Sequence, residues 1–288
     1  MRGAALLLLI GAIWGLGFTL TRIVIGAGAA PVTLAFWQTG SGALLLFALG
    51  RRPVLDRAHL RFYAITGVLG SALPSLLVAM AARHVEAGVL AVAMALAPML
   101  CLMLCIVGRI ERVTPRRALG MALGLAAVVV IARPGGEAAM AGLLLAVGAA
   151  ASYAVEDVYI AIGRPPASGA FTLLSGMLTA GALWLLPGVA LSGQWVPLPI
   201  EAQGAWLALA LIASSNLLAY AAFVTLITRS GAVFASQVAY VIVAAGVVWG
   251  IVILGERHPA GFWVGVALML AGLVLTLPKG ERKAALRP

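Results

Sequence analysis

Ten apolar runs of about 20 residues, separated by short polar segments, fill the sequence from one end to the other. An α-helix rises 1.5 Å per residue, so about 20 residues cross a hydrocarbon core of about 30 Å. Strands of a membrane barrel would instead be about 10 residues of alternating polarity. The runs therefore predict membrane-spanning helices over residues 4–22, 32–49, 62–82, 87–107, 115–132, 140–162, 170–190, 204–227, 231–254 and 259–277.

The composition agrees with an integral membrane protein. Hydrophobic residues make up 63% of the chain and charged residues only 10%, with a mean hydropathy of +1.11. A soluble domain carries about a quarter of its residues as charges. The segments between the runs are too short to form a separate soluble domain, so we expect one all-α membrane domain over residues 1–288.

The first run has a second interpretation. Its opening, MRGAALLLLIGAIWG, also fits a secretory signal, with Arg2 as the charged region and Ala27-Gly28-Ala29 as a possible cleavage site. We expect it to be the first span, because it is as long as a full crossing and its removal would break the internal repeat described below.

The basic residues are distributed unequally between the segments on the two sides of the membrane. The formal net charge is +10, but the basic residues form no single stripe of the kind that binds nucleic acid. With the N-terminus in the cytoplasm, the inner segments hold Arg2, Arg51, Arg52, Arg57, Arg61, Arg109, Arg112, Arg116, Arg117, Arg164, Arg229, Lys279, Arg282, Lys283 and Arg287, and the outer segments hold Arg22, Arg83, Arg133 and Arg257. This positive-inside bias predicts that both termini are cytoplasmic.

An internal repeat relates the two halves of the chain. A shift of 145 residues aligns ERVTPRRALGMALGLAAVV, from Glu111, with ERHPAGFWVGVALMLAGLV, from Glu256. Each half contains five spans, and an odd number of crossings inverts the second copy relative to the first. We expect a first repeat over residues 1–134 and a second, inverted repeat over 138–280. Secondary transporters use such repeats to open a central, mid-membrane site to either side in turn.

Three short motifs carry a family resemblance: GAIWGLGF at residues 11–18, MALAPML around Pro98, and LGE at residues 254–256. They resemble the EamA-type branch of the drug/metabolite transporter superfamily. The resemblance implies ten helices in two inverted five-helix repeats, with a central cavity lined mainly by spans 1, 3, 4, 6, 8 and 9. One departure is that Val241 and Ile242 stand where the family commonly repeats the proline.

The resemblance also implies a function and a location. It points to a secondary transporter in the bacterial inner membrane that exports small neutral or zwitterionic metabolites by alternating access. Amino acids, including aromatic ones, are the nearest substrate class, with other metabolites or drugs as the alternative. The expected partners are this small molecule and the lipid bilayer, with no nucleic acid and no cofactor. An intramembrane enzyme or a channel is the competing class; the sequence has no HExxH, GxSxG or Walker motif. The oligomeric state stays open.

Polar and aromatic side chains near the middle of a span should face protein or water rather than lipid. The candidate substrate-binding residues are Trp14, Phe18, Ser71, Ser75, Met94, Pro98, Tyr153, Glu156, Ser215, Asn216, Tyr220, Gln237 and Tyr240. The serines could instead bond to their own helix, and the aromatic residues could fill the core. Pro98 should bend the fourth span, as a hinge, a cavity wall or a tolerated kink.

The stretch SYAVEDVYI places Glu156 and Asp157 in the inner third of the sixth span. Consecutive helical residues point about 100° apart, so the two carboxylates cannot both face one cavity. Either both reach cytoplasmic water or an inner arginine such as Arg164, or Glu156 faces the cavity to meet a substrate ammonium group or carry a proton. Arginines are absent from mid-membrane positions, which argues against phosphorylated substrates.

We expect no metal site. Cys101 and Cys105 stand one turn apart as apolar filler, and His59, His84 and His258 lie at loops or helix ends. Small residues give the fifth and tenth spans faces for close helix packing, namely Gly120, Gly124, Gly261 and Gly265.

Overall fold

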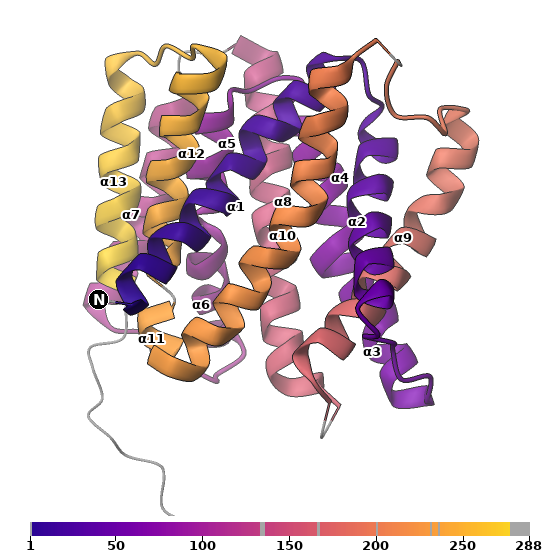
Figure 1. The fold of residues 1–288 in the computed structure, drawn as a ribbon. Helices are drawn as coiled ribbons and strands as arrows, with labels where there is room; N and C mark the ends of the chain where they lie inside the picture. Colours follow the sequence, from indigo (N-terminus) through magenta and orange to yellow (C-terminus); the bar gives the residue numbers. More distant parts are fainter. Residues whose placement is uncertain are drawn as a thin grey trace, which may run out of the picture.

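The computed structural model describes residues 2–132, 136–165, 168–199, 201–230, 232–235 and 237–276 (Figure 1). Within these residues the chain forms helices and loops and no strand. The helices are α1 (Arg2–Gly26), α2 (Pro31–Ala48), α3 (Arg57–Gly67), the π-helix η1 (Val68–Ala72), α4 (Leu73–Ala81), α5 (Ala87–Met94), α6 (Ala97–Val107), α7 (Pro115–Ala132), α8 (Gly136–Gly163), α9 (Ala170–Ser192), α10 (Gln203–Ser230), α11 (Ala232–Ala235), α12 (Val238–Leu254) and α13 (Ala260–Thr276).

The all-α fold with ten spans is confirmed. Over the described part of the chain, α3, η1 and α4 together form the third span, α5 and α6 the fourth, and α11 and α12 the ninth. Among the described residues, seven helical segments are long and apolar enough to cross a membrane, α12 and α13 are shorter apolar helices, and α2 falls in neither group. The proposed limits of the two repeats, 1–134 and 138–280, stay a prediction.

Local sequence sets several helix ends. α2 and α7 begin at Pro31 and Pro115, which suit the first helical turn because a proline has no N–H to satisfy there. Asp56 caps α3 by accepting a hydrogen bond from the His59 N–H at 2.9 Å. α12 ends at Leu254 and is followed by Gly255, whose φ of 67° is the left-handed conformation that glycine adopts without strain.

The fifth and tenth spans, α7 and α13, pack against each other in opposite directions. A Cβ on Gly120 would lie 2.7 Å from the Gly272 oxygen, and a Cβ on Gly265 would lie 3.1 Å from the Ala127 oxygen. The start of each helix therefore lies beside the end of the other. A shift of 145 residues converts the first contact into the second. The two halves are thus inverted copies in the register that the sequence predicts.

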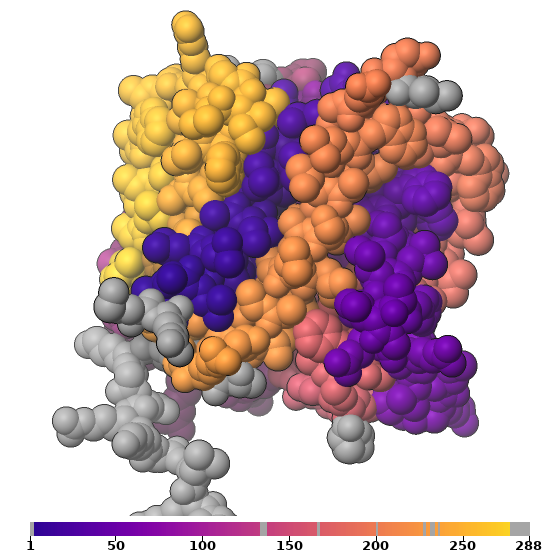
Figure 2. All heavy atoms as spheres, viewed as in Figure 1, coloured from indigo at the N-terminus to yellow at the C-terminus, as the bar shows by residue number. Residues whose placement is uncertain are grey.

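The remaining helices also pack against helices of the other half. α1 packs on α10 and α12, α8 packs on α4, α5 and α6, and α2 packs on α9. On the face shown in Figure 2, α10 lies between α1 and α2. α1 begins and α13 ends at the same end of the bundle (Figure 1). We call this end the Glu111 face and the opposite end, which carries the loop between α12 and α13, the Glu256 face.

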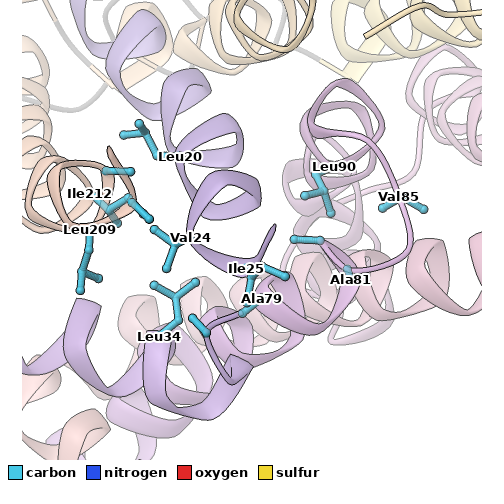
Figure 3. Close-up of a cluster of buried hydrophobic side chains, with 14 of the residues drawn as sticks. Leu20, Val24, Ile25, Leu34, Ala79, Ala81, Val85, Leu90, Leu209 and Ile212 are labelled. Atoms are coloured by element: carbon cyan, nitrogen blue, oxygen red, sulfur yellow. The ribbon is translucent and has the colours of Figure 1, made fainter. Parts of the chain in front are cut away.

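A large apolar cluster fills the bundle below the Glu256 face (Figure 3). Side chains from six helices, α1, α2, α4, α5, α8 and α10, and from the loops next to them contribute to it, including Leu20, Val24, Ile25, Leu34, Ala79, Ala81, Val85, Leu90, Leu209 and Ile212. Several of these side chains are completely buried. A cavity of about 360 Å³ lies beside this cluster, lined among others by Val85, Leu143 and His258.

Because α7 and α13 make equivalent contacts with each other, substitution of equivalent glycines in the two helices should lower stability equally. We expect Gly120→Ala and Gly265→Ala each to lower the free energy of unfolding in detergent by about 1–3 kcal/mol, because the added methyl group overlaps the Gly272 oxygen in the first case and the Ile131 side chain in the second. Thermal unfolding followed by size-exclusion chromatography measures this loss.

The matched control is Gly261→Ala. Sequence analysis assigned Gly261 to the packing face, but no described neighbour lies within 4 Å of the position its Cβ would take. Alanine there should be neutral or slightly stabilising, because it favours helix over glycine. Equal losses at all three positions would contradict these equivalent contacts.

Candidate functional site

The third span contains a π-helix that sequence analysis did not predict. In η1, the Leu73 N–H bonds to the Val68 oxygen, five residues earlier, instead of following the usual spacing of four. The signal in the sequence is Pro74, which has no N–H to offer the carbonyl of Gly70. Single π-helical turns leave carbonyl groups for other partners and are frequent at functional sites.

Two residues of α8, one turn apart, face this π-helix. The Ser152 hydroxyl donates a hydrogen bond to the Leu69 oxygen at 2.7 Å. The Glu156 carboxyl group lies against Gly70, so closely that a Cβ on Gly70 would overlap it. The missing side chain at Gly70 therefore makes the space that the carboxyl group occupies.

Glu156 is buried, with 6% of its surface exposed, whereas Asp157 is exposed. No lysine or arginine of the described chain forms an ion pair with Glu156. Arg164, the expected partner, donates instead to the Ser168 oxygen at 2.9 Å. The interpretation in which both carboxylates reach water or Arg164 is therefore wrong for Glu156.

Two other predicted site residues join Glu156. Tyr153, in α8, and Tyr220, in α10, lie within electrostatic range of its carboxyl group, without a hydrogen bond to it. Tyr220 also makes an edge-to-face contact with Phe171 of α9, with 6.1 Å between the ring centroids. The Glu156 site therefore combines one carboxyl group with phenol hydroxyls and ring faces. These groups can accept an ammonium group and an apolar or aromatic side chain.

The other predicted aromatic and methionine residues lie at helix contacts. Trp14 meets Phe223 edge to face, with centroids 5.2 Å apart. Phe18 lies beside Gly246, where α1 crosses α12. Met94 and Tyr240 pack on the same buried cluster between α5 and α12. The Tyr240 hydroxyl is buried without a hydrogen-bond partner in the described chain.

The small polar residues of the predicted site lie in different environments. Ser71 donates to the Thr39 hydroxyl at 3.2 Å and so joins α2 rather than the Glu156 site. The Ser215 hydroxyl bonds within its own helix, to the Ile212 oxygen at 3.4 Å. Ser75, Asn216 and Gln237 are half-buried.

Pro98 interrupts the fourth span, as expected. α5 ends at Met94 and α6 begins at Ala97, and the Leu96 N–H bonds to the Ala93 oxygen across the break. The Pro98 side chain itself is exposed. The ninth span is also divided, between α11 and α12, although it lacks the equivalent proline.

A polar cluster that was not predicted lies at the Glu256 face. Glu86, Glu256 and His258 bring their side-chain oxygen and nitrogen atoms within 4.8 Å of one another, which is close enough for metal ligands. The shared Glu-Arg of the repeat was the available signal, because it placed Glu256 at a position that the two halves have in common.

These features define a helical, multi-pass membrane protein built from two inverted five-helix repeats. The model of the EamA-like transporter family matches residues 1–133 and again residues 140–277. The chain therefore belongs to the EamA-like transporter family, whose members are membrane transporters of small molecules and not enzymes.

Solved structures show the same fold. One of them, titled only "Crystal structure of protein", is 18% identical, covers 93% of this chain and 95% of its own, and superposes with a TM-score of 0.60. No curated protein matches the chain.

The importance of the position of the Glu156 carboxyl group against the π-helix can be tested with Gly70→Ala. The added methyl group would overlap the carboxyl group and push it away from η1. We expect transport to fall at least tenfold, about the rate effect of 1.4 kcal/mol. Flux in proteoliposomes, normalised to folded protein, is the measurement.

Gly148→Ala is the matched control on the same helix as Glu156. A Cβ on Gly148 would lie 3.5 Å from Leu77, an ordinary contact. Transport should stay within about twofold of the wild type, because ordinary contacts need no rearrangement. Unchanged flux in Gly70→Ala would show that the position of the carboxyl group does not matter.

Proposed function

We propose that the protein is a secondary transporter that exports small neutral or zwitterionic metabolites across the bacterial inner membrane by alternating access. Amino acids, including aromatic and hydrophobic ones, are the proposed substrates. Other metabolites or drugs are the alternative. Both termini are proposed to be cytoplasmic, which makes the Glu111 face the inner face.

The observation that carries the proposal is the Glu156 carboxyl group. It is buried, it has no basic partner in the described chain, and it lies beside an irregular backbone segment. A buried carboxylate without a counter-ion is costly, so such a group takes up a proton or binds a cation. An amino acid offers an ammonium group, and a proton can exchange with it at the same carboxyl group.

The surroundings of Glu156 favour an amphipathic substrate. Tyr153 and Tyr220 offer ring faces and hydroxyls within electrostatic range of the carboxyl group. An aromatic ring of the substrate would stack on these faces, and its ammonium group would meet the carboxylate. A phosphorylated substrate would need fixed cations, which the central parts of the spans lack.

Efflux from proteoliposomes tests the transport proposal. Vesicles loaded with labelled amino acids, one at a time, are diluted into buffer with and without a pH gradient. We expect saturable efflux and counterflow for aromatic and large apolar amino acids. The absence of counterflow across the whole panel would reject the amino acid assignment, and non-saturable flux would indicate a channel.

Replacement of Glu156 tests its role directly. We expect Glu156→Gln to reduce transport at least tenfold and to remove its dependence on pH, because the amide neither binds an ammonium group ionically nor carries a proton. Glu137→Gln is the matched control, since Glu137 is an exposed acid on the same helix and lies away from Glu156. An unchanged rate with an unchanged pH profile in Glu156→Gln would end the assignment.

A further inference from the structure

We propose that Glu256 is a latch that closes the Glu256 face, and that Glu111 closes the opposite face when the transporter changes state. The inference rests on the proposed alternating access. It adds the residues that hold each closed state.

The latch is formed by two charge-assisted hydrogen bonds. The Glu256 Oε1 atom accepts from the Ala87 N–H at 2.6 Å, and Oε2 accepts from the Gly88 N–H at 3.0 Å. These N–H groups belong to the first turn of α5, where backbone donors lack a partner within the helix. A carboxylate there also complements the positive end of the helix dipole. The α5 cap residue itself, Glu86, makes no such side-chain bond.

The bonds join the two repeats and are shielded from water. Glu256 follows α12 in the second half, whereas α5 lies in the first. Only 5% of the Glu256 side chain is exposed. The carboxylate fills a space at Gly250, where a Cβ would overlap it. Burial makes these bonds stronger than they would be in water.

Other groups lie at the same junction. The side chain of His258, 1% exposed, lies with Nδ1 2.7 Å from Glu86 and Nε2 3.5 Å from Glu256, and neither nitrogen makes a hydrogen bond within the described chain. The ring stacks on Phe262, with 3.9 Å between centroids. Arg22 of α1 donates to the Val85 oxygen, in the loop before α5. Below the latch lies the apolar cluster of Figure 3.

The equivalent acid at the other face is in a different state. The 145-residue register pairs Glu256 with Glu111, and pairs Ala87 and Gly88 with Ala232 and Val233 at the start of the ninth span. Glu111 is 48% exposed and bonds to Arg117, in its own half, at 2.9 Å. Two equivalent carboxylates therefore make unequal contacts: one joins the halves and the other does not. If Glu111 joined the two halves and Glu256 did not, the opposite face would be the closed one. Alternating access requires this exchange between two equivalent states.

A metal ion is the competing explanation for the Glu86, Glu256 and His258 cluster. Both oxygens of Glu256 accept a backbone N–H group, which leaves one further lone pair on each oxygen. The two buried ring nitrogens of His258 make no hydrogen bond within the described chain, and they lie beside different carboxylates, whereas a metal ion binds one nitrogen of a ring. The contacts therefore favour the latch, and the metal is one outcome of the test.

The test measures access from the Glu256 face. A single cysteine is introduced as Ala79→Cys, at a position that is 1% exposed within the apolar cluster, in a chain whose Cys101 and Cys105 are replaced by serine. A membrane-impermeant maleimide is added to oriented proteoliposomes from that side. We expect Glu256→Gln to raise the labelling rate about tenfold, the effect of about 1.4 kcal/mol on the equilibrium between the two states. Glu111→Gln should lower the rate.

The matched control is Glu137→Gln. Glu137 is an exposed acid in the first turn of α8 and belongs to neither the Glu156 site nor the latch. Its replacement should leave labelling unchanged. The double variant Glu111→Gln/Glu256→Gln should return toward the wild-type rate, which an unfolded protein cannot do.

The outcomes separate the latch from the transport proposal. Unchanged labelling in Glu256→Gln would falsify the latch even if counterflow is normal. Changed labelling without counterflow of any amino acid would keep the latch and reject the proposed substrate. A tenfold rise in wild-type labelling on addition of EDTA, reversed by Zn²⁺, would replace the latch with a metal lock.

Discussion

No water is available in a bilayer to satisfy a backbone N–H or C=O group, and this constraint shapes the irregular points of the third and fourth spans. Where a helix is unbroken, its own turns satisfy these groups. Where it is interrupted, another helix must supply the partner. The Leu69 carbonyl, released by the π-helix, is satisfied by Ser152, and the first N–H groups of α5 are satisfied by Glu256. The breaks in the third and fourth spans are therefore also the places where distant parts of the chain meet.

The same constraint explains how far the sequence could be interpreted. Span number and length follow from the crossing distance, and the observed helices agree with the predicted ranges to within a few residues. The repeat register also followed from the sequence, because the Glu-Arg pair and the glycine after it are independent of hydrophobicity. Residues of this kind identify one alignment register, whereas a run of leucines can be aligned in many.

The orientation of each helix could not be predicted in the same way. A helix that is apolar all round does not show which face is buried. Ser71 and Glu156 both looked like residues of one cavity, yet Ser71 bonds to Thr39 in α2, while Glu156 rests on Gly70. The π-helix depends on this packing too: Pro74 indicates a break, but only the Ser152 hydroxyl and the space at Gly70 determine its form. Tertiary contacts, absent from any local pattern, decide these positions.

The contact between α7 and α13 has a consequence for the origin of the fold. The two helices contact each other through equivalent surfaces, because the contact of Gly120 with Gly272 repeats as that of Gly265 with Ala127. A surface that fits an upside-down copy of itself would also hold together two separate, identical chains of five helices inserted in opposite directions. An ancestral half of this size could thus have assembled as a dimer before gene duplication and fusion made the two copies diverge.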